Sequence, residues 1–410
     1  MSQRVVHVIG AGPAGLMAAE RLAGVGLRVV VHERMPSVAR KFLMAGRGGL
    51  NLTHSEPDDR FLRRYGSACG AVGPWLEGFG QADLINWAEG LGQPTFVGSS
   101  GRVFPKAMKA SPLLRAWLTR LADLAVELRT RSRWLGWRDG GLAFETPDGE
   151  QIERPDAVVL AMGGASWPRL GSDGAWVDAL AGVGVEIAPL RPANAGFDVA
   201  WSEVLKARFA GVAVKPVTLT HGDRSVRGEL MLTRYGIEGG AVYAMSTELR
   251  EAIASEGSAV LTVDLRPDLS VQALAERLAR SRGKDSVTNH LRKAGGLSPA
   301  AIAMLREIGE VPPGAEKLAK RIKGLRLKLT GMQGLERAIS SAGGVALDAV
   351  DDRLMLKARP GVFVAGEMLD WEAPTGGYLL QASFASGSVA ADGVLAWLDR
   401  EAAPGQGASS

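Results

Sequence analysis

The sequence predicts an α/β fold in which a parallel sheet is interrupted by a long insertion of different character. Near the N-terminus, a short apolar strand is followed by a glycine-rich turn and a helix. Apolar strands that end in glycine return at residues 157–164 and 361–367. Such continuous apolar strands are typical of a parallel sheet that is buried on both faces. Between about Leu190 and Ser341 the pattern changes, which predicts an insertion.

The first motif is Gly10-Ala-Gly12-Pro-Ala-Gly15, which lies between the apolar run Val5–Ile9 and a helix with one apolar face. In this context the three glycines allow a tight turn, a close approach to a pyrophosphate and close helix–strand packing. Pro13 and Ala14 open the helix, and proline is well tolerated there because its missing N–H would have no intrahelical partner. The free N–H groups and the dipole of a helix N-terminus favour phosphate. The motif predicts a Rossmann-like dinucleotide site.

A second strand, Arg28–His32, ends at Glu33 and is followed by Arg34. A carboxylate at this position can accept hydrogen bonds from both hydroxyls of an adenosine ribose, and it would repel a 2′-phosphate. NADP is therefore disfavoured here. The alternative is a simple glycine turn with a solvated Glu33, but the agreement of strand, spacing, helix and acid favours the nucleotide.

The C-terminal part points to FAD. The strand that ends in Gly366-Glu367 supplies a carboxylate for the hydroxyls of a ribityl chain. A helix that starts at Gly376–Tyr378 would direct its N-terminus at the N1/C2=O edge of the flavin and stabilise the reduced form. Ala157–Gly164 is predicted to return beside the cofactor. For these segments an ordinary structural strand or helix is the alternative.

Composition limits the remaining possibilities. Cys69 is the only cysteine, which excludes an intrachain disulfide and a cysteine metal cluster and suits a reducing cytosol. No signal peptide or membrane span is predicted, so we expect a cytoplasmic protein. The histidines show no metal-ligand spacing, so no metal is expected. The net charge of +4 says little about partners, and residues 401–410 read as a disordered tail.

The insertion has a β part and a helical part. Strands are predicted at 212–220, 225–233 and 259–265, and helices at 271–294 and 298–324. Its basic residues form two groups: Arg277, Arg280, Arg282, Lys284, Arg292 and Lys293, then Lys317, Lys320, Arg321, Lys323, Arg326 and Lys328. A solvated helix surface is the favoured interpretation. The alternative is a collar for anionic substrates or an anionic surface.

The loop Arg40-Lys-Phe-Leu-Met-Ala-Gly-Arg-Gly-Gly-Leu-Asn-Leu-Thr-His54 resembles a signature loop of the BaiN/RdsA-like NAD(P)/FAD-dependent oxidoreductases. This family is also labelled the aminoacetone oxidase family of FAD-binding enzymes. Segments 161–168, 228–239 and 366–378 resemble the family as well. The chain departs from the commoner pattern at Arg47 and Leu50, within Arg47-Gly-Gly-Leu-Asn51, and at Met162.

The resemblance implies a two-part FAD domain, residues 1–190 and 341–400, that holds FAD non-covalently. It also implies an insert at 191–340, with a small β-barrel (about 191–269 and 326–340) and a helical subdomain (about 270–325). Together with the motifs above, it gives the expected FAD-binding residues: Gly10, Gly12, Pro13, Ala14, Gly15, Glu33, Arg34, Arg40, Lys41, Gly46, Gly48, Gly49, Asn51, Ala161, Gly163, Gly366, Glu367, Gly376, Gly377 and Tyr378.

The expected reaction is hydride transfer between flavin N5 and a small organic substrate held between the FAD domain and the insert. The leading hypothesis is an oxidoreductase that reduces or oxidises a C=C or similar bond. By the resemblance, NAD(P)H is a transient electron donor if the reaction is a C=C reduction. We find no second Gly-x-Gly-x-x-Gly after a strand, so NAD(P)H would enter the same cleft. Tyr235, which lies in the family-matching segment 228–239, is the candidate acid or base, and Arg234 is a candidate anion clamp or acid. For both residues a structural role is the favoured alternative. The alternatives are an O₂-using oxidase of a small amine, and a flavoprotein whose basic insert binds nucleic acid or an anionic surface.

Overall fold

The computed structural model describes residues 3–46 and 48–402, and they form two compact units. Unit 1 contains the described residues up to Arg191 and from Ser340 onward, and unit 2 runs from Pro192 to Ile339. Arg47 lies outside the described residues. The last helix, α15 (Tyr378–Ala402), includes the first two positions of the predicted tail, and the rest of that tail also lies outside.

Unit 1 is built on a five-stranded sheet with the order β19-β10-β1-β2-β6. Its strands are β1 (Val5–Ile9), β2 (Arg28–Glu33), β6 (Glu127–Thr130), β10 (Ala157–Leu160) and β19 (Val362–Val364). All neighbours are parallel, and Val8 of β1 lies between Val31 of β2 and Val159 of β10. These three valines are fully buried. The predicted α/β fold with a Rossmann-like parallel sheet is confirmed.

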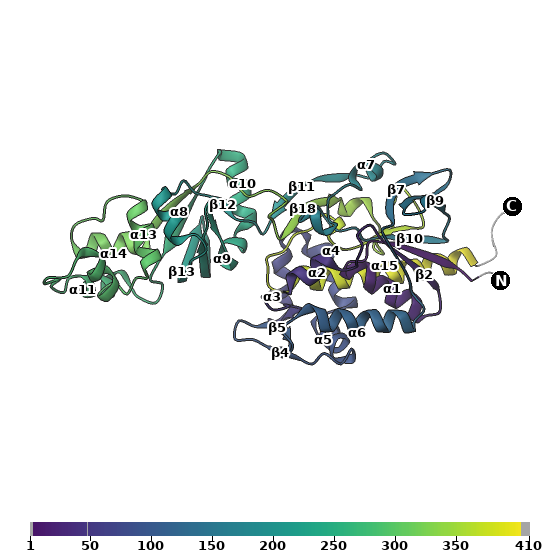
Figure 1. Cartoon of the computed structure of the whole chain (residues 1–410), viewed down its shortest axis with the longest axis horizontal. Helices are drawn as coiled ribbons and strands as arrows, with labels where there is room; N and C mark the ends of the chain where they lie inside the picture. Colours follow the sequence, from purple (N-terminus) through teal and green to yellow (C-terminus); the bar gives the residue numbers. More distant parts are fainter. Residues whose placement is uncertain (1–2, 47, 403–410) are drawn as a thin grey trace. The chain divides into compact units, whose positions relative to one another are not determined.

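Two helices from opposite ends of the chain lie side by side next to this sheet: α1 (Pro13–Gly24) and α15 (Figure 1). Small residues allow the close approach. A Cβ at Gly387 of α15 would lie 2.3 Å from the carbonyl oxygen of Ala14 in α1. The glycine turn after β1 is therefore held from two sides, by the sheet and by the C-terminal helix.

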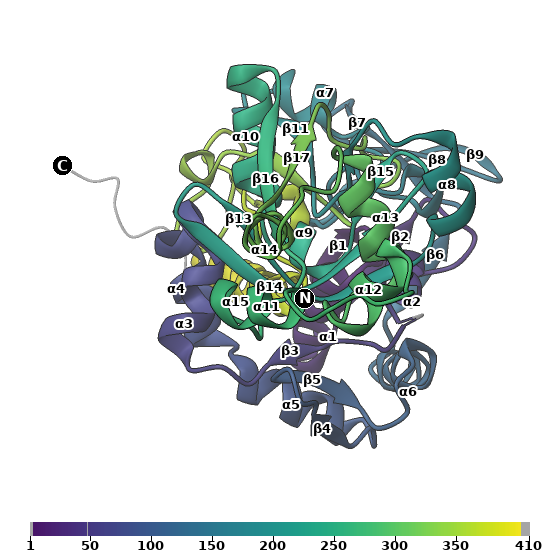
Figure 2. The same cartoon turned by 90° about the vertical axis from the view of Figure 1, so that its left-hand side faces the viewer.

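The remaining parts of unit 1 surround this centre. Residues 133–153 form a three-stranded antiparallel meander, β7-β8-β9, and a second small sheet, β3-β5-β4, lies beside α5 (Figure 2). The bounds are α2 (Arg40–Ala45), β3 (Thr53–His54), α3 (Asp58–Leu62), α4 (Cys69–Gly78), α5 (Gln81–Gly90), β4 (Thr95–Val97), β5 (Arg102–Pro105), α6 (Ala110–Asp123), β7 (Arg133–Arg138), β8 (Gly141–Thr146), β9 (Gly149–Glu153), α7 (Val177–Ala181), β11 (Ile187–Ala193) and β18 (Ser340–Val345).

Unit 2 contains a six-stranded antiparallel sheet with the order β12-β15-β14-β13-β16-β17. Its strands are β12 (Phe197–Asp198), β13 (Ala213–His221), β14 (Arg224–Leu232), β15 (Gly236–Glu238), β16 (Ala259–Asp264) and β17 (Leu325–Leu329). An antiparallel bridge between Phe197 and Met332 joins the first strand to the segment after the last. This bridge closes the sheet into the small barrel that the family resemblance implies.

The helices of unit 2 correct one expectation. The two predicted long helices are four short ones, α11 (Val271–Leu278), α12 (Val287–Lys293), α13 (Pro299–Glu307) and α14 (Ala315–Lys323). Between α13 and α14 the chain contains Pro312 and Pro313, and Gly309 and Gly314 adopt positive φ; proline and such glycines end helices. The β part also carries α8 (Glu203–Phe209), α9 (Gly240–Tyr243) and α10 (Ser246–Glu256). Over the described residues, none of the helices has the length and apolar character needed to cross a membrane.

Candidate functional site

The glycine turn between β1 and α1 gives each glycine a distinct environment. Gly10 has φ +105°, and a Cβ there would lie 2.3 Å from the carbonyl oxygen of Ala161. A Cβ at Gly15 would lie 2.0 Å from the carbonyl oxygen of Gly10. A Cβ at Gly12 would meet no described atom within 4 Å. The protein itself therefore needs glycine at positions 10 and 15, whereas Gly12 leaves space above the N-terminus of α1.

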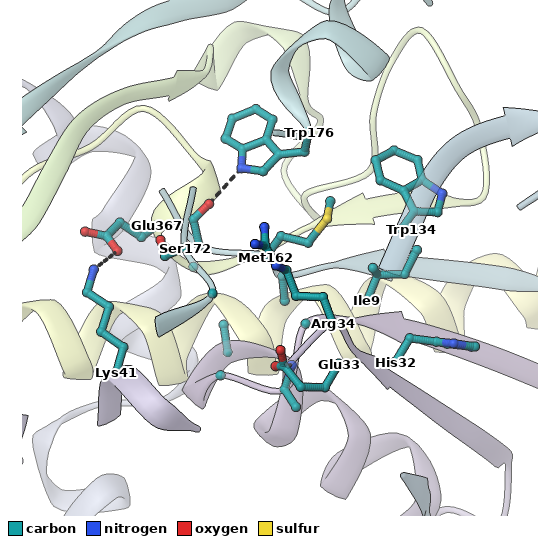
Figure 3. Close-up of a pocket in the computed structure, with 18 of the residues that line it drawn as sticks. Ile9, His32, Glu33, Arg34, Lys41, Trp134, Met162, Ser172, Trp176 and Glu367 are labelled. Carbon is teal, nitrogen blue, oxygen red and sulfur yellow. Dashed lines mark hydrogen bonds and ion pairs between the residues drawn. The ribbon is translucent and has the colours of Figure 1, made fainter. Parts of the chain in front are cut away.

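A cavity opens at this turn, along the carboxyl ends of β1, β2 and β10 (Figure 3). Parallel sheets bind their ligands at this edge. Many of the predicted cofactor residues line it: Gly10, Gly12, Pro13, Ala14, Glu33, Arg34, Arg40, Lys41, Ala161, Gly163, Gly366 and Glu367. These residues come from both ends of the chain, and the fold brings them into one cavity.

The other predicted cofactor residues do not line this cavity. Gly15 is used for packing, and a Cβ at Gly46 would lie 2.7 Å from Ala110. Gly48, Gly49 and Asn51 follow α2, while Gly376, Gly377 and Tyr378 lead into α15. The two loops meet, because a Cβ at Gly377 would lie 2.5 Å from the backbone of Thr53. The loop after α2 and the start of α15 thus form one continuous structure beside the cavity.

Glu33 ends β2 with its carboxylate held in place by the backbone. Oε2 accepts the N–H of Ala11 at 3.2 Å, and Oε1 accepts the N–H of Met35 at 2.8 Å. Burial raises the pKa of Glu33, while these two hydrogen bonds and nearby arginines oppose the shift. Arg34 forms an ion pair with Asp173 at the same end of the cavity.

An ion pair between Lys41 and Glu367 connects α2 with the turn η4 (Gly366–Met368) after β19. Lys41 Nζ lies 2.7 Å from Glu367 Oε2 (Figure 3). The other oxygen of Glu367 accepts the N–H of Ser341 at 2.9 Å. Both side chains are partly buried, and their contacts hold the two charges on the cavity wall. This pair offers a cation to a phosphate and a carboxylate to hydroxyl groups.

Several buried polar atoms here have no hydrogen-bond partner among the described residues. Three belong to residues that line the cavity: Arg40 Nε, Trp134 Nε1 and Ser172 Oγ. Three more, Asn51 Oδ1, Thr53 Oγ1 and Gln381 Oε1, belong to the loop after α2 and the first turn of α15. Native proteins rarely leave such groups unpaired. Together with the space at Gly12, they fit an extended polar ligand such as FAD.

Sequence reasoning missed part of this lining. Trp134, Ser172, Asp173 and Trp176 were not predicted, and Trp176 donates its indole N–H to the carbonyl of Gly163 at 2.9 Å. A signal was available, because Gly171 and Gly174, which adopt positive φ, flank two of these residues. Such glycines indicate a shaped loop.

The two candidate catalytic residues belong to unit 2. Arg234 is exposed and Tyr235 is half-buried. The hydroxyl of Tyr235 donates to the carboxylate of Glu238, and the guanidinium of Arg337 lies 5.6 Å from the tyrosine ring centre. Burial, and then Glu238, raise the pKa of Tyr235, so the phenol keeps its proton at neutral pH.

A family model described as the HI0933-like protein Rossmann domain matches residues 4–393. The chain belongs to this family. It is 26% identical over 403 residues to the 3-dehydro-bile acid delta(4,6)-reductase of Clostridium scindens, a match that covers 94% of this chain and 97% of that protein. It is 24% identical over 403 residues to the ribosomal RNA dihydrouridine synthase of Escherichia coli, covering 95% and 97%.

The fold of this chain is also found in a solved structure. The chain is similar to the 3-ketosteroid delta1-dehydrogenase of Sterolibacterium denitrificans, with a TM-score of 0.51, 12% identity and coverage of 96% of this chain and 100% of that one. This likeness concerns the fold alone. The family match confirms the resemblance found in the sequence, and the protein is an FAD-dependent oxidoreductase with a Rossmann-like FAD-binding domain.

Proposed function

We propose that the protein reduces a C=C bond conjugated to a carbonyl group in a small organic molecule, with NAD(P)H as the electron donor. The names of two relatives with unlike substrates carry this proposal. The names delta(4,6)-reductase and dihydrouridine synthase both describe chemistry at a C=C bond near a carbonyl. The bound flavin would supply the hydride.

The residues of unit 1 would bind and orient the cofactor. The free N–H groups of α1 and the space at Gly12 suit a pyrophosphate. Glu33 suits the adenosine ribose, and the Lys41–Glu367 pair suits the polar chain that leads to the flavin ring. Each of these groups is already fixed by backbone or ion-pair contacts, so little reorganisation is needed on binding.

A proton must reach the second carbon of the reduced bond, and Tyr235 is our candidate donor. Its raised pKa keeps the phenol protonated, and Glu238 orients the hydroxyl. Arg234 is exposed next to it and would hold an anionic group of the substrate. We expect Tyr235→Phe to slow substrate reduction at least about 100-fold while NAD(P)H still reduces the flavin at the normal rate. Equal loss of both rates would contradict this role.

The proposal is tested with purified protein. It should be yellow and release FAD on heating or in acid. Under anaerobic conditions NADH or NADPH should bleach the flavin, and an α,β-unsaturated ketone should restore its colour with formation of the saturated product. A colourless protein that cannot be reconstituted with FAD would contradict the proposal. Peroxide production from a small amine in air, without enone turnover, would favour an oxidase instead.

A second candidate substrate is a uridine base in RNA, which the name of one relative suggests. Exposed basic residues of unit 2 favour it, among them Arg277, Arg280 and Arg282. Others are neutralised within the unit, since Lys320 pairs with Glu316 and Lys323 with Asp264. Binding to RNA that weakens steeply with salt, together with NAD(P)H-dependent loss of uridine, would support this candidate. Absence of binding at low salt would remove it.

A further inference from the structure

One end of the cavity holds a chain of three hydrogen-bonded side chains to which no function has been given above. Ser132 Oγ lies 2.8 Å from His32 Nδ1, and His32 Nε2 lies 3.0 Å from His7 Nδ1. Ser132 and His32 line the cavity, whereas His7 lies behind them on β1. All three are at most 3% exposed. These side chains thus form a buried polar chain that reaches the ligand cavity.

The orientation of this chain is fixed. The ring of His32 stacks on Phe144, with centroids 3.9 Å apart and an angle of 13° between the planes. Burial lowers the pKa of His7 to about 4 and that of His32 to about 3, so both rings are neutral at physiological pH. A neutral imidazole has one N–H and one acceptor nitrogen. The chain is therefore directional, and the Ser132 hydroxyl keeps hydrogen-bonding capacity for the cavity, because it has one donor and two acceptor sites and His32 uses one of them.

A second polar group at the same end also needs a partner. Trp134 lines the cavity, and its buried indole N–H has no acceptor among the described residues. Figure 3 shows Trp134 and His32 at one end of the cavity, with Glu33 and Arg34 nearby. Met162 and Trp176 line the same cavity. At the end with His32, the Trp134 ring thus offers a flat apolar wall beside one unpaired N–H and one shared hydroxyl.

We propose that Ser132 and Trp134 bind the edge of the adenine base of FAD, and that His32 and His7 are positioning residues that orient the Ser132 hydroxyl. The inference rests on the proposed function, because it takes FAD as the ligand. Adenine is a flat base that presents an amino donor and ring-nitrogen acceptors on its edges. The indole N–H of Trp134 requires an acceptor, and a ring nitrogen supplies it. Glu33, where the ribose is expected, follows His32 directly in β2.

The test compares ligands that contain or lack the adenosine half. Protein freed of flavin is titrated with FAD and with FMN by flavin fluorescence, and ADP is used to displace FAD. We expect Ser132→Ala and Trp134→Phe each to weaken FAD and ADP about tenfold, as loss of one buried hydrogen bond predicts, and to leave FMN affinity unchanged. Ser255→Ala in α10 is the matched control, since its hydroxyl bonds only to carbonyls of its own helix.

The positioning role of His7 has its own comparison. His7→Leu should weaken ADP and FAD, and His7→Asn, whose amide can replace the ring nitrogen toward His32, should restore most of the affinity. If Ser132→Ala and Trp134→Phe bind ADP like the unmodified protein, or lose FMN as strongly as FAD, this inference is wrong. Protein that binds neither FAD nor ADP in any form would instead contradict the proposed function.

Discussion

The two ends of the candidate FAD site satisfy their polar groups differently. The fingerprint end is formed by the glycine turn of residues 10–15 and by the ends of β1 and β2. Here Gly10 donates its N–H to the carbonyl of His32, and Glu33 accepts two backbone N–H groups. At the loop end, formed by residues 48–53 and 376–381, Asn51 and Thr53 each carry a buried oxygen without a partner among the described residues. At the fingerprint end the backbone of the turn and the Glu33 carboxylate are therefore already paired within the protein, whereas the Trp134 N–H beside them has no acceptor among the described residues. We expect the loop end to gain its partners when the cofactor binds.

The largest effect on stability is expected at Gly10 of the fingerprint end, and Gly12, whose surroundings are open, is the comparison. Gly10→Ala places a Cβ against the carbonyl of Ala161 in a backbone conformation with positive φ, so we expect destabilisation of about 3 kcal/mol or more. Gly12→Ala places its Cβ in open space, so the flavin-free protein should keep its stability and lose FAD affinity. Thermal unfolding and FAD titration of both variants check this. Equal stability of the two would contradict it.

The next effect depends on pH and concerns the two buried histidines of the fingerprint end. In the unfolded chain histidine titrates near pH 6.5, whereas burial lowers the pKa of His7 to about 4 and of His32 to about 3. Below pH 6.5 the unfolded chain binds protons that the folded chain does not. The contribution of these histidines to the free energy of unfolding should therefore be constant above pH 6.5 and fall by a few kcal/mol toward pH 4.

Denaturant unfolding across this pH range measures the loss, and hydrogen exchange locates it. Amides of β1 and β2 should lose protection before those of the loop end. Charged groups near His7 have smaller effects on its pKa than burial has: Glu153 raises this pKa and Arg129 lowers it. His221→Gln is the control, because this histidine lies in unit 2 and bonds only a backbone carbonyl, that of Val260. An unchanged profile in a His7→Leu/His32→Leu variant would show that other groups cause the loss.

Glu33→Ala should have a moderate effect on both stability and binding. It removes the acceptor of two backbone hydrogen bonds, so we expect a loss of about 2 kcal/mol without flavin. FAD affinity should fall further, about tenfold or more, if the carboxylate also accepts the ribose hydroxyls. Glu33→Gln retains one acceptor oxygen, so its stability and FAD affinity should lie between those of the unmodified protein and the alanine variant. Unchanged FAD affinity in the alanine variant would remove the ribose role.

Asn51→Ala should have the smallest effect on the flavin-free protein and a measurable effect on the complex. Its Oδ1 has no partner among the described residues, so its removal should change the unfolding free energy by less than about 0.5 kcal/mol. With FAD bound, the loss of one hydrogen bond should lower the affinity a few-fold. A large loss of stability without flavin would contradict the contrast between the two ends.

The sequence predicts most of the fingerprint end because local rules govern it. Strand periodicity, the spacing of Gly10 to Gly15 and the acid at position 33 each depend on neighbours in the chain. Trp134 and Ser172 were not predicted, because they reach the cavity only when the meander and the loop before α7 fold back onto the sheet. The break between α13 and α14 was readable, since Pro312 and Pro313 stand within the predicted helix.

Local sequence rules do not predict the candidate catalytic residues. Tyr235 was suggested by the family resemblance, and its partner Glu238 follows three positions later in the same segment. Nothing in the spacing of the histidines indicates that His7 and His32 touch. Their contact arises because β1 and β2 pair in parallel with His7 opposite Val30, a register that side-chain alternation alone does not specify.

The chain leaves unit 1 through β11 and returns through β18, and these two strands pair with each other. Their approach is close, since a Cβ at Gly343 would lie 2.1 Å from the carbonyl oxygen of Pro189. The insert therefore enters and leaves unit 1 at one place in its fold. Changes in length or sequence within residues 192–339 need not disturb the parallel sheet that holds the nucleotide turn.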